Sequence, residues 1–286
     1  MSLVSAMKRN LTTKINSGLA LSWVRSGGLS QVRNMAHKSD THLIVKEYLD
    51  MGGGRSVVYR KLFAKKNADK KPTIVMVPGL VSHVNMDEEG KKAGTIFNYC
   101  DHYDYSCVLY DSEWQSSDKA ASSDALTVID KLTDGPVVLV GSGVGCWLSL
   151  ITAQAMPAEK LHGLVLISPR SPLPHRYYEH SYLDLGVKKD LVEDSVRHEI
   201  DENQMINIGC PVRIISSLRD KETIPEHLIE LAASLKTKDV DLIYRKGSDH
   251  MLKNIYDLEL VLLTVDRMLM TYSVGQSFTD LEVEAE

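Results

Sequence analysis

A short run of alternating glycines constrains the fold of this chain more than any other sequence feature. It reads Gly141-Ser142-Gly143-Val144-Gly145 and follows the apolar, β-branched stretch 137–140. A second apolar stretch, 144–155, comes directly after and has a helical character. Alternate glycines let a strand and a helix approach closely through a tight turn. The run therefore predicts a buried strand that turns directly into a helix.

The remainder of the chain alternates between strand-like and helix-like segments. Two strand-like runs, 43–49 and 57–62, flank Gly52-Gly53-Gly54 and predict an antiparallel hairpin at a sheet edge. Further strands are expected at 73–77, 107–110, 137–140, 164–168, 212–215 and 240–244, and helices at 88–99, 118–132, 144–155, 226–236 and 252–270. Such alternation predicts an α/β fold, in which a mostly parallel sheet carries helices on both faces.

Two parts of the chain interrupt this pattern. Prolines, the pair Tyr177-Tyr178 and many charged residues predict an insertion at about 170–207, which we expect to form a small helical cap. Residues 273–286 are expected to form an acidic C-terminal tail. The expected globular domain is therefore 40–272, which is long enough to bury one substantial core.

The first 39 residues have the composition of a mitochondrial transit peptide. They contain six Lys and Arg residues, no Asp or Glu, and many Ser, Leu and small residues. Charges interrupt their apolar stretches, so neither a secretory signal nor a membrane-spanning helix of about 20 apolar residues is expected. We therefore expect import into mitochondria, with the matrix as the destination.

Without that segment the chain is acidic. Residues 40–286 hold 27 Lys and Arg against 38 Asp and Glu, a formal net charge of −11, which argues against a nucleic-acid partner. The cysteines show no Cys-x-x-Cys pair, so we expect no metal site and no disulfide framework; they are Cys100, Cys107, Cys146 and Cys210. No cofactor is expected, because no Gly-x-Gly-x-x-Gly turn follows the first parallel strand.

The glycine run also matches a catalytic motif at every fixed position but one. Gly-x-Ser-x-Gly forms the nucleophile elbow of α/β-hydrolases, with the serine on a strained strand-to-helix turn. Here Gly143 occupies the serine position, between Gly141 and Gly145. An acid and then a histidine follow the nucleophile in this fold, and Asp220 and His250 occur in that order. Two of the three positions of a catalytic triad are therefore filled.

Local sequence narrows the resemblance. The stretches that carry it are Val77-Pro78-Gly79, Asp134-Gly135-Pro136, Cys146-Trp147-Leu148 and Arg245-Lys246-Gly247-Ser248-Asp249-His250. Together they resemble a mitochondrial branch of the α/β-hydrolases, the acyl-protein thioesterases and acyl-glucuronide esterases, from about residue 43 to residue 270. The chain departs from that branch at 111–116, where a glycine-containing turn is usual.

The resemblance implies a role for each site residue. The nucleophile position falls on Gly143, the acid on Asp220 and the base on His250. The oxyanion hole falls on the backbone N–H groups of Leu80 and Val144, which the loss of a serine side chain leaves in place. An acyl ester or acyl thioester is the implied ligand.

Other interpretations of nearby residues remain open. Glu222 is an alternative to Asp220 as the acid, because the spacing from Asp220 to the following proline is one residue longer than is usual. Asp220 could instead cap a helix. His250 could be an ordinary surface or core histidine. Ser142 should face away from the base, since successive strand residues point to opposite sides. Cys146 should be a small core residue.

Three functional hypotheses follow. The first is a mitochondrial protein of the acyl-thioesterase or carboxylesterase type, catalytically impaired by Gly143 but keeping an acyl-binding pocket. The second is an active ester or thioester hydrolase, in which Asp220 and His250 activate water or Ser142 attacks. The third is a non-enzymatic scaffold that binds a protein partner through the cap containing Tyr177-Tyr178.

Overall fold

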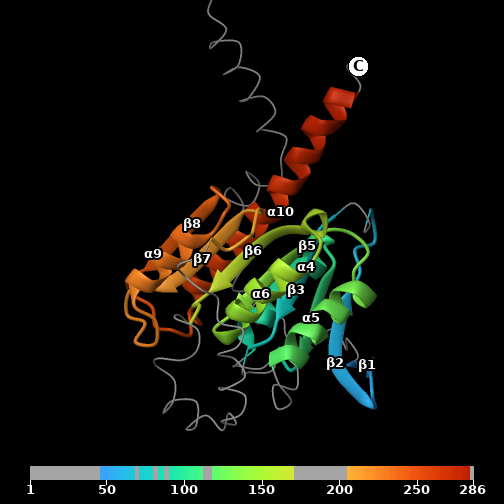
Figure 1. Ribbon diagram of the computed structural model, residues 1–286, viewed down its shortest axis with the longest axis horizontal. Coiled ribbons are helices and arrows are strands. Elements are labelled where there is room, and N and C mark those ends of the chain that lie inside the picture. The colour runs from blue at the N-terminus through green and yellow to red at the C-terminus, as the bar shows by residue number, and fades with distance from the viewer. Residues whose placement is uncertain are drawn as a thin grey trace, which may run out of the picture.

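A computed structural model gives the fold of the chain (Figure 1). It describes residues 46–67, 71–79, 83–86, 90–111, 118–170 and 205–283, with only the backbone described for 118–121 and 272–283. The expected transit segment 1–39, Leu80, Tyr177-Tyr178 and almost all of the expected cap lie outside these residues.

The centre of the molecule is one eight-stranded sheet in the order β1-β2-β4-β3-β5-β6-β7-β8. Its strands are β1 (Glu47–Gly52), β2 (Arg55–Leu62), β3 (Thr73–Val77), β4 (Cys107–Asp111), β5 (Val137–Ser142), β6 (Leu161–Ile167), β7 (Val212–Ser217) and β8 (Val240–Arg245). The pairs β1–β2 and β2–β4 are antiparallel, and the other neighbouring strands pair in parallel. Because the strand order reverses at β3, a ligand crevice is expected at the carboxyl ends of the strands beside it.

Helices cover both faces of this sheet. The α-helices of the described part of the chain are α4 (Lys91–Tyr103), α5 (Asp118–Leu132), α6 (Val144–Ala155), α9 (Pro225–Ser234) and α10 (Ile255–Val283), and a short 3-10 helix, η1 (Ala158–Lys160), precedes β6. Successive strand residues point to opposite faces: Val75 and Val77 pack in the core cluster of α5, α6 and α9, whereas Ile74 and Met76 pack in that of α4 and α10. The expected α/β fold with helices on both faces is confirmed.

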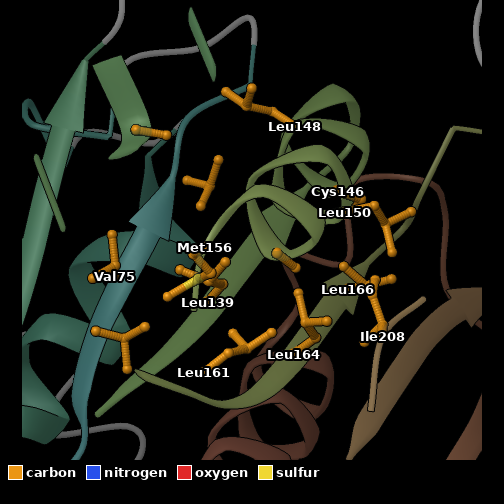
Figure 2. Close-up of a cluster of buried hydrophobic side chains, with 14 of the residues drawn as sticks. Val75, Leu139, Cys146, Leu148, Leu150, Met156, Leu161, Leu164, Leu166 and Ile208 are labelled. Atoms are coloured by element: carbon orange, nitrogen blue, oxygen red, sulfur yellow. The ribbon is translucent and has the colours of Figure 1, made fainter. Parts of the chain in front are cut away.

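Helix α6 follows β5 with Gly143 alone between them. Figure 2 shows its residues Cys146 and Leu150 close to Leu166 of β6, within one cluster of buried side chains. Leu148 and Leu150 are fully buried, and a buried leucine contributes about 1.5–3 kcal/mol of transfer free energy. This packing fixes the position of the turn that leads into α6.

The C-terminal helix is longer than the sequence pattern predicts. Instead of ending near Met270, α10 continues to Val283, so most of the segment expected to be an acidic tail is helical. A glycine such as Gly275 costs a helix only about 1 kcal/mol, which a long helix can absorb. At about 1.5 Å per residue, α10 is about 44 Å long, and its C-terminal turns extend beyond the body of the molecule (Figure 1).

Candidate functional site

Gly143 forms the apex of the turn from β5 to α6. Its dihedral angles are φ 59° and ψ −121°, in a region that residues with a Cβ enter at a cost of about 1–3 kcal/mol. A Cβ at this position would have nothing within 4 Å. The backbone therefore keeps the strained shape of a nucleophile elbow, and there is room for a side chain at its apex.

Close packing requires the two flanking glycines. A Cβ on Gly141 would lie 2.5 Å from the carbonyl oxygen of Gly145 and 2.6 Å from Oγ of Ser149. A Cβ on Gly145 would lie 2.5 Å from the carbonyl oxygen of Val77, in β3. These separations are too short for real atoms, so both positions need glycine for the strand and the helix to approach.

The loop after β3 lies beside the start of α6, where the oxyanion hole is expected. Val144 is the first residue of the helix, so its N–H has no carbonyl acceptor one turn earlier within the helix. Gly79, in the loop after β3, packs against the elbow: a Cβ there would lie 2.8 Å from the carbonyl oxygen of Ser142 and 4.0 Å from the nitrogen of Val144. The loop that carries Leu80 therefore begins beside Val144, while Leu80 itself lies outside the described residues.

Asp220 and His250 form a hydrogen-bonded pair. Asp220 follows β7, and His250 lies between β8 and α10. The Nδ1–H group of His250 donates to Oδ2 of Asp220 at 2.8 Å, and the Asp220 side chain is fully buried. Burial alone would raise the pKa of Asp220, but the hydrogen bond and charge of His250 and the N–H groups of Glu222 and Thr223 outweigh it, so this pKa is lowered. The ionised carboxylate therefore fixes the orientation of the imidazole.

The competing carboxylate of Glu222 has a different partner. It forms an ion pair with Arg170, at the end of the described segment after β6. Its side chain is 40% exposed, whereas that of Asp220 is fully buried. Of the two carboxylates, Asp220 is therefore the one that contacts His250.

A chain of contacts connects His250 to the elbow. The N–H of Gly143 donates to the carbonyl oxygen of Ile167 at 3.0 Å. Ser168, the next residue, is buried and its Oγ donates to the carbonyl oxygen of His250 at 2.6 Å. The end of β6 therefore holds both the elbow and the histidine loop, and the positions of Gly143, Asp220 and His250 gather at the carboxyl edge of the sheet.

A buried network also anchors the segment that leads to His250. The carboxylate of Asp257, in α10, accepts hydrogen bonds from Oγ of Ser248 and Nδ2 of Asn254, and an ion pair at 3.3 Å from Nε of Arg245. Asp257 is 1% exposed, so its charge needs such partners. The stretch from Arg245 to His250, which carried part of the sequence resemblance, thus has a structural reason for its polar residues.

Cys146 and Ser142 are two other residues near the elbow with a nucleophilic side chain. Cys146 is buried in the core cluster (Figure 2), where burial raises the pKa of its thiol to about 12, and its Sγ donates to the carbonyl oxygen of Ile167 at 3.4 Å. Such a thiol is not nucleophilic at neutral pH. Ser142 is the last residue of β5 and pairs in register with Ile167. It therefore belongs to the strand, one residue before the apex.

Sequence reasoning missed Lys92 and Ser168, which both contact the histidine loop. The pair Lys91-Lys92 suggests a solvated helix end, yet Lys92 is only 8% exposed. One signal was available: Lys92 lies one helical turn before Ile96, a fully buried residue, so the helical period places it on the buried face. For Ser168, which directly follows β6, the sequence offers no comparable signal.

The described residues show neither a metal cluster nor a membrane-spanning helix. Among the described residues, no cluster of three or more His, Cys, Asp or Glu side chains could hold a metal ion. Within the same ranges, no helix combines the length and the hydropathy needed to cross a membrane. The four cysteines are free thiols.

Comparison with solved structures identifies the class of fold. The α/β-hydrolase domain-containing protein 10 from mouse aligns with a TM-score of 0.67 at 22% sequence identity, over 79% of this chain and 99% of that chain. Est1E from Butyrivibrio proteoclasticus aligns with a TM-score of 0.64 at 15% identity, over 80% of this chain and 99% of that chain. The chain therefore has the α/β-hydrolase fold.

Sequence comparison gives a more particular relationship. The chain is 28% identical over 239 residues to the mitochondrial palmitoyl-protein thioesterase ABHD10 of Homo sapiens. This alignment covers 72% of this chain and 75% of that relative. No family model matches the chain. This protein is thus an α/β-hydrolase-fold protein similar to a mitochondrial thioesterase.

Proposed function

We propose that this protein binds an acyl ester or acyl thioester at the elbow, and that Gly143 makes it catalytically impaired relative to serine-containing relatives. One observation carries the proposal. The apex residue keeps the elbow angles of φ 59° and ψ −121° beside a hydrogen-bonded Asp220–His250 pair, but has no side chain to attack a carbonyl. The acid–base pair and the shape of the elbow are thus kept, while the nucleophile is absent.

The magnitudes support this division. Removing the serine of a triad lowers turnover by about a millionfold, whereas the oxyanion hole and substrate binding alone retain roughly 10³–10⁴ over the reaction in water. Without Oγ of residue 143 no acyl-enzyme can form. The N–H of Val144 can still polarise an acyl carbonyl, and the imidazole of His250 can still accept a proton. Slow turnover at most, with retained binding, is the expected result.

The ligand class comes from the relatives. The similar proteins are named palmitoyl-protein thioesterases, so we propose a long-chain acyl thioester as the preferred ligand. Their name also includes "mitochondrial", which agrees with the basic, acid-free composition of residues 1–39. We therefore propose that the protein acts in mitochondria.

Gly143→Ser is the direct test of the impaired-enzyme proposal. The variant should hydrolyse p-nitrophenyl esters and palmitoyl thioesters at least about a hundredfold faster than the wild-type chain, because only Oγ is missing from the triad. It should also become labelled by a fluorophosphonate probe. Gly143→Ala is the matched control, since it introduces the same Cβ and the same backbone strain of about 1–3 kcal/mol without a hydroxyl group. The alanine variant should stay inactive.

Two results would contradict the proposal. One is steady, probe-labelled turnover of acyl thioesters by the wild-type chain. The other is equal activity of Gly143→Ser and Gly143→Ala, both folded and both able to bind a non-hydrolysable palmitoyl thioether. Binding is read from the rise in melting temperature that a ligand of the folded state produces.

The two hydrogen bonds of His250 favour a second candidate function, slow ester hydrolysis by an activated water molecule. Its ring bonds Asp220, and its carbonyl bonds Ser168, an arrangement suited to general-base activation of a water molecule. In that case the wild-type chain would hydrolyse esters slowly, without probe labelling, and both His250→Ala and Asp220→Asn would abolish the activity. If wild-type hydrolysis persists in His250→Ala, water activation by this pair is excluded.

A further inference from the structure

Lys92, near the start of α4, is a buried cation that the proposed mechanism does not use. Its side chain is largely enclosed, and Nζ donates to the carbonyl oxygen of Met251 at 2.7 Å. Burial lowers the pKa of Lys92 from 10.5 to about 8, and the charges of Asp249 and Asp257 only partly oppose this effect. An ammonium group held at such a cost needs a specific partner, and the Met251 carbonyl is that partner.

The carbonyl that Lys92 bonds belongs to the residue after His250. The neighbouring carbonyl, that of His250 itself, accepts from Oγ of Ser168. On the other side, Oδ1 of Asp249 accepts the N–H groups of Met251 at 3.0 Å and Leu252 at 3.2 Å. Leu252 has φ 47°, a backbone conformation that a leucine rarely adopts without external restraint. The peptide groups around His250 are therefore fixed by side chains from separate elements.

We infer that Lys92 is a positioning residue, whose hydrogen bond to Met251 fixes the backbone that aims the His250 imidazole at the elbow. The inference rests on the proposed function in so far as the imidazole acts at the elbow. The contact joins α4 to the loop before α10, which carries His250. A cationic donor gives a stronger hydrogen bond than a neutral one.

The free energy of unfolding of a Lys92 variant should distinguish a positioning role from a purely structural one. Replacing Lys92 with Met removes a buried charge, which relieves its desolvation cost, but leaves the carbonyl of Met251 without its donor. These effects oppose each other, so Lys92→Met should keep a stability similar to that of the wild type. The histidine loop, however, should lose a restraint. A stable fold with a loosened His250 is the signature of a positioning residue.

The experiment follows the Nδ1–H proton of His250 by NMR in the full-length wild-type background, after ¹⁵N labelling of histidine and assignment with His250→Gln. Lys92→Met should speed the exchange of this proton with water by about tenfold, the equivalent of one lost hydrogen bond. Lys91→Met is the matched control on the same helix and should leave the exchange rate unchanged. Lys92→Gln, which keeps an N–H donor, should restore part of the protection.

An unchanged exchange rate in Lys92→Met would overturn the inference. Failure of Lys92→Met to fold would also overturn it, because a positioning role predicts retained stability. In that case, the folding of Lys92→Gln shows whether a neutral hydrogen-bond donor is enough for the chain to fold. In the Gly143→Ser background, Lys92→Met should lower kcat by about tenfold with KM within about twofold of its parent. If Gly143→Ser itself is inactive, the proposed function fails, whereas the NMR result still decides the role of Lys92.

Discussion

His83 is a fully enclosed imidazole in the loop between β3 and α4, and its protonation should limit the stability of the fold in acid. Burial lowers the pKa of His83 from 6.5 to about 4, although the charge of Asp111 and the carbonyl of Met76 partly oppose this shift. The unfolded chain binds the proton near pH 6.5, but the folded chain binds it only near pH 4. Stability is therefore lost as the pH falls through this window.

The expected loss is roughly 3 kcal/mol between pH 6.5 and pH 4. Urea unfolding at intervals across that range should show it for the wild-type chain. His83→Gln, which cannot be protonated there, should have a shallower dependence on pH, even if its stability at pH 7 is lower. Parallel curves for the two proteins would show that His83 is not the group responsible.

Residues differ in how far the sequence could predict their surroundings. The prediction that Gly143, Asp220 and His250 share one site followed from chain order, because the carboxyl ends of parallel strands meet at one edge of a sheet. The choice between Asp220 and Glu222 did not, since two residues of loop geometry decide which carboxylate reaches the imidazole. The partner of Lys92 is 159 residues away in the chain, and no local pattern encodes such a contact.

The junction of β5 and α6 should tolerate no side chain at its flanking glycines. Gly145→Ala would place a Cβ 2.5 Å from the carbonyl oxygen of Val77 and 3.0 Å from that of Pro78. Backbone atoms cannot move aside as a flexible side chain can, so we expect a loss of about 3 kcal/mol in the free energy of unfolding. Urea or thermal unfolding of the purified variant measures it.

Gly209→Ala is the control for that prediction. A Cβ on Gly209 would have nothing within 4 Å, and this glycine has no positive φ. Its replacement should change stability by less than about 0.5 kcal/mol. A similar loss in both variants would mean that the close approach of α6 to β3 is not what restricts Gly145.

Elements with a strong internal pattern were predicted well. Helix α6 spans the expected 144–155, because its apolar sequence and its preceding glycines agree. The ends of other elements were less certain: α4 begins at Lys91 rather than at residue 88, and the first strand ends at Gly52 rather than at residue 49. Capping and pairing partners from distant parts of the chain determine such ends, and local composition does not contain them.

At the scale of the whole molecule, the basic N-terminal segment should determine where the protein resides. Residues 1–39 fused to a fluorescent protein should direct it into mitochondria, because six basic residues without an acidic one fit the import signal. The chain without residues 1–39 should remain outside them. Fluorescence microscopy with a mitochondrial stain tests both. Mitochondrial localisation of the shortened chain would place the signal elsewhere.

The backbone of Gly143 also bears on how readily the site can change over generations. The glycine codons GGT and GGC become serine codons by one change at the first base. Because the elbow keeps its shape, its flanking glycines and its open apex without a serine, such a change would meet a backbone already in the required conformation. Where the codon of residue 143 is GGT or GGC, a single nucleotide change would therefore place a serine hydroxyl at the apex without rebuilding the turn.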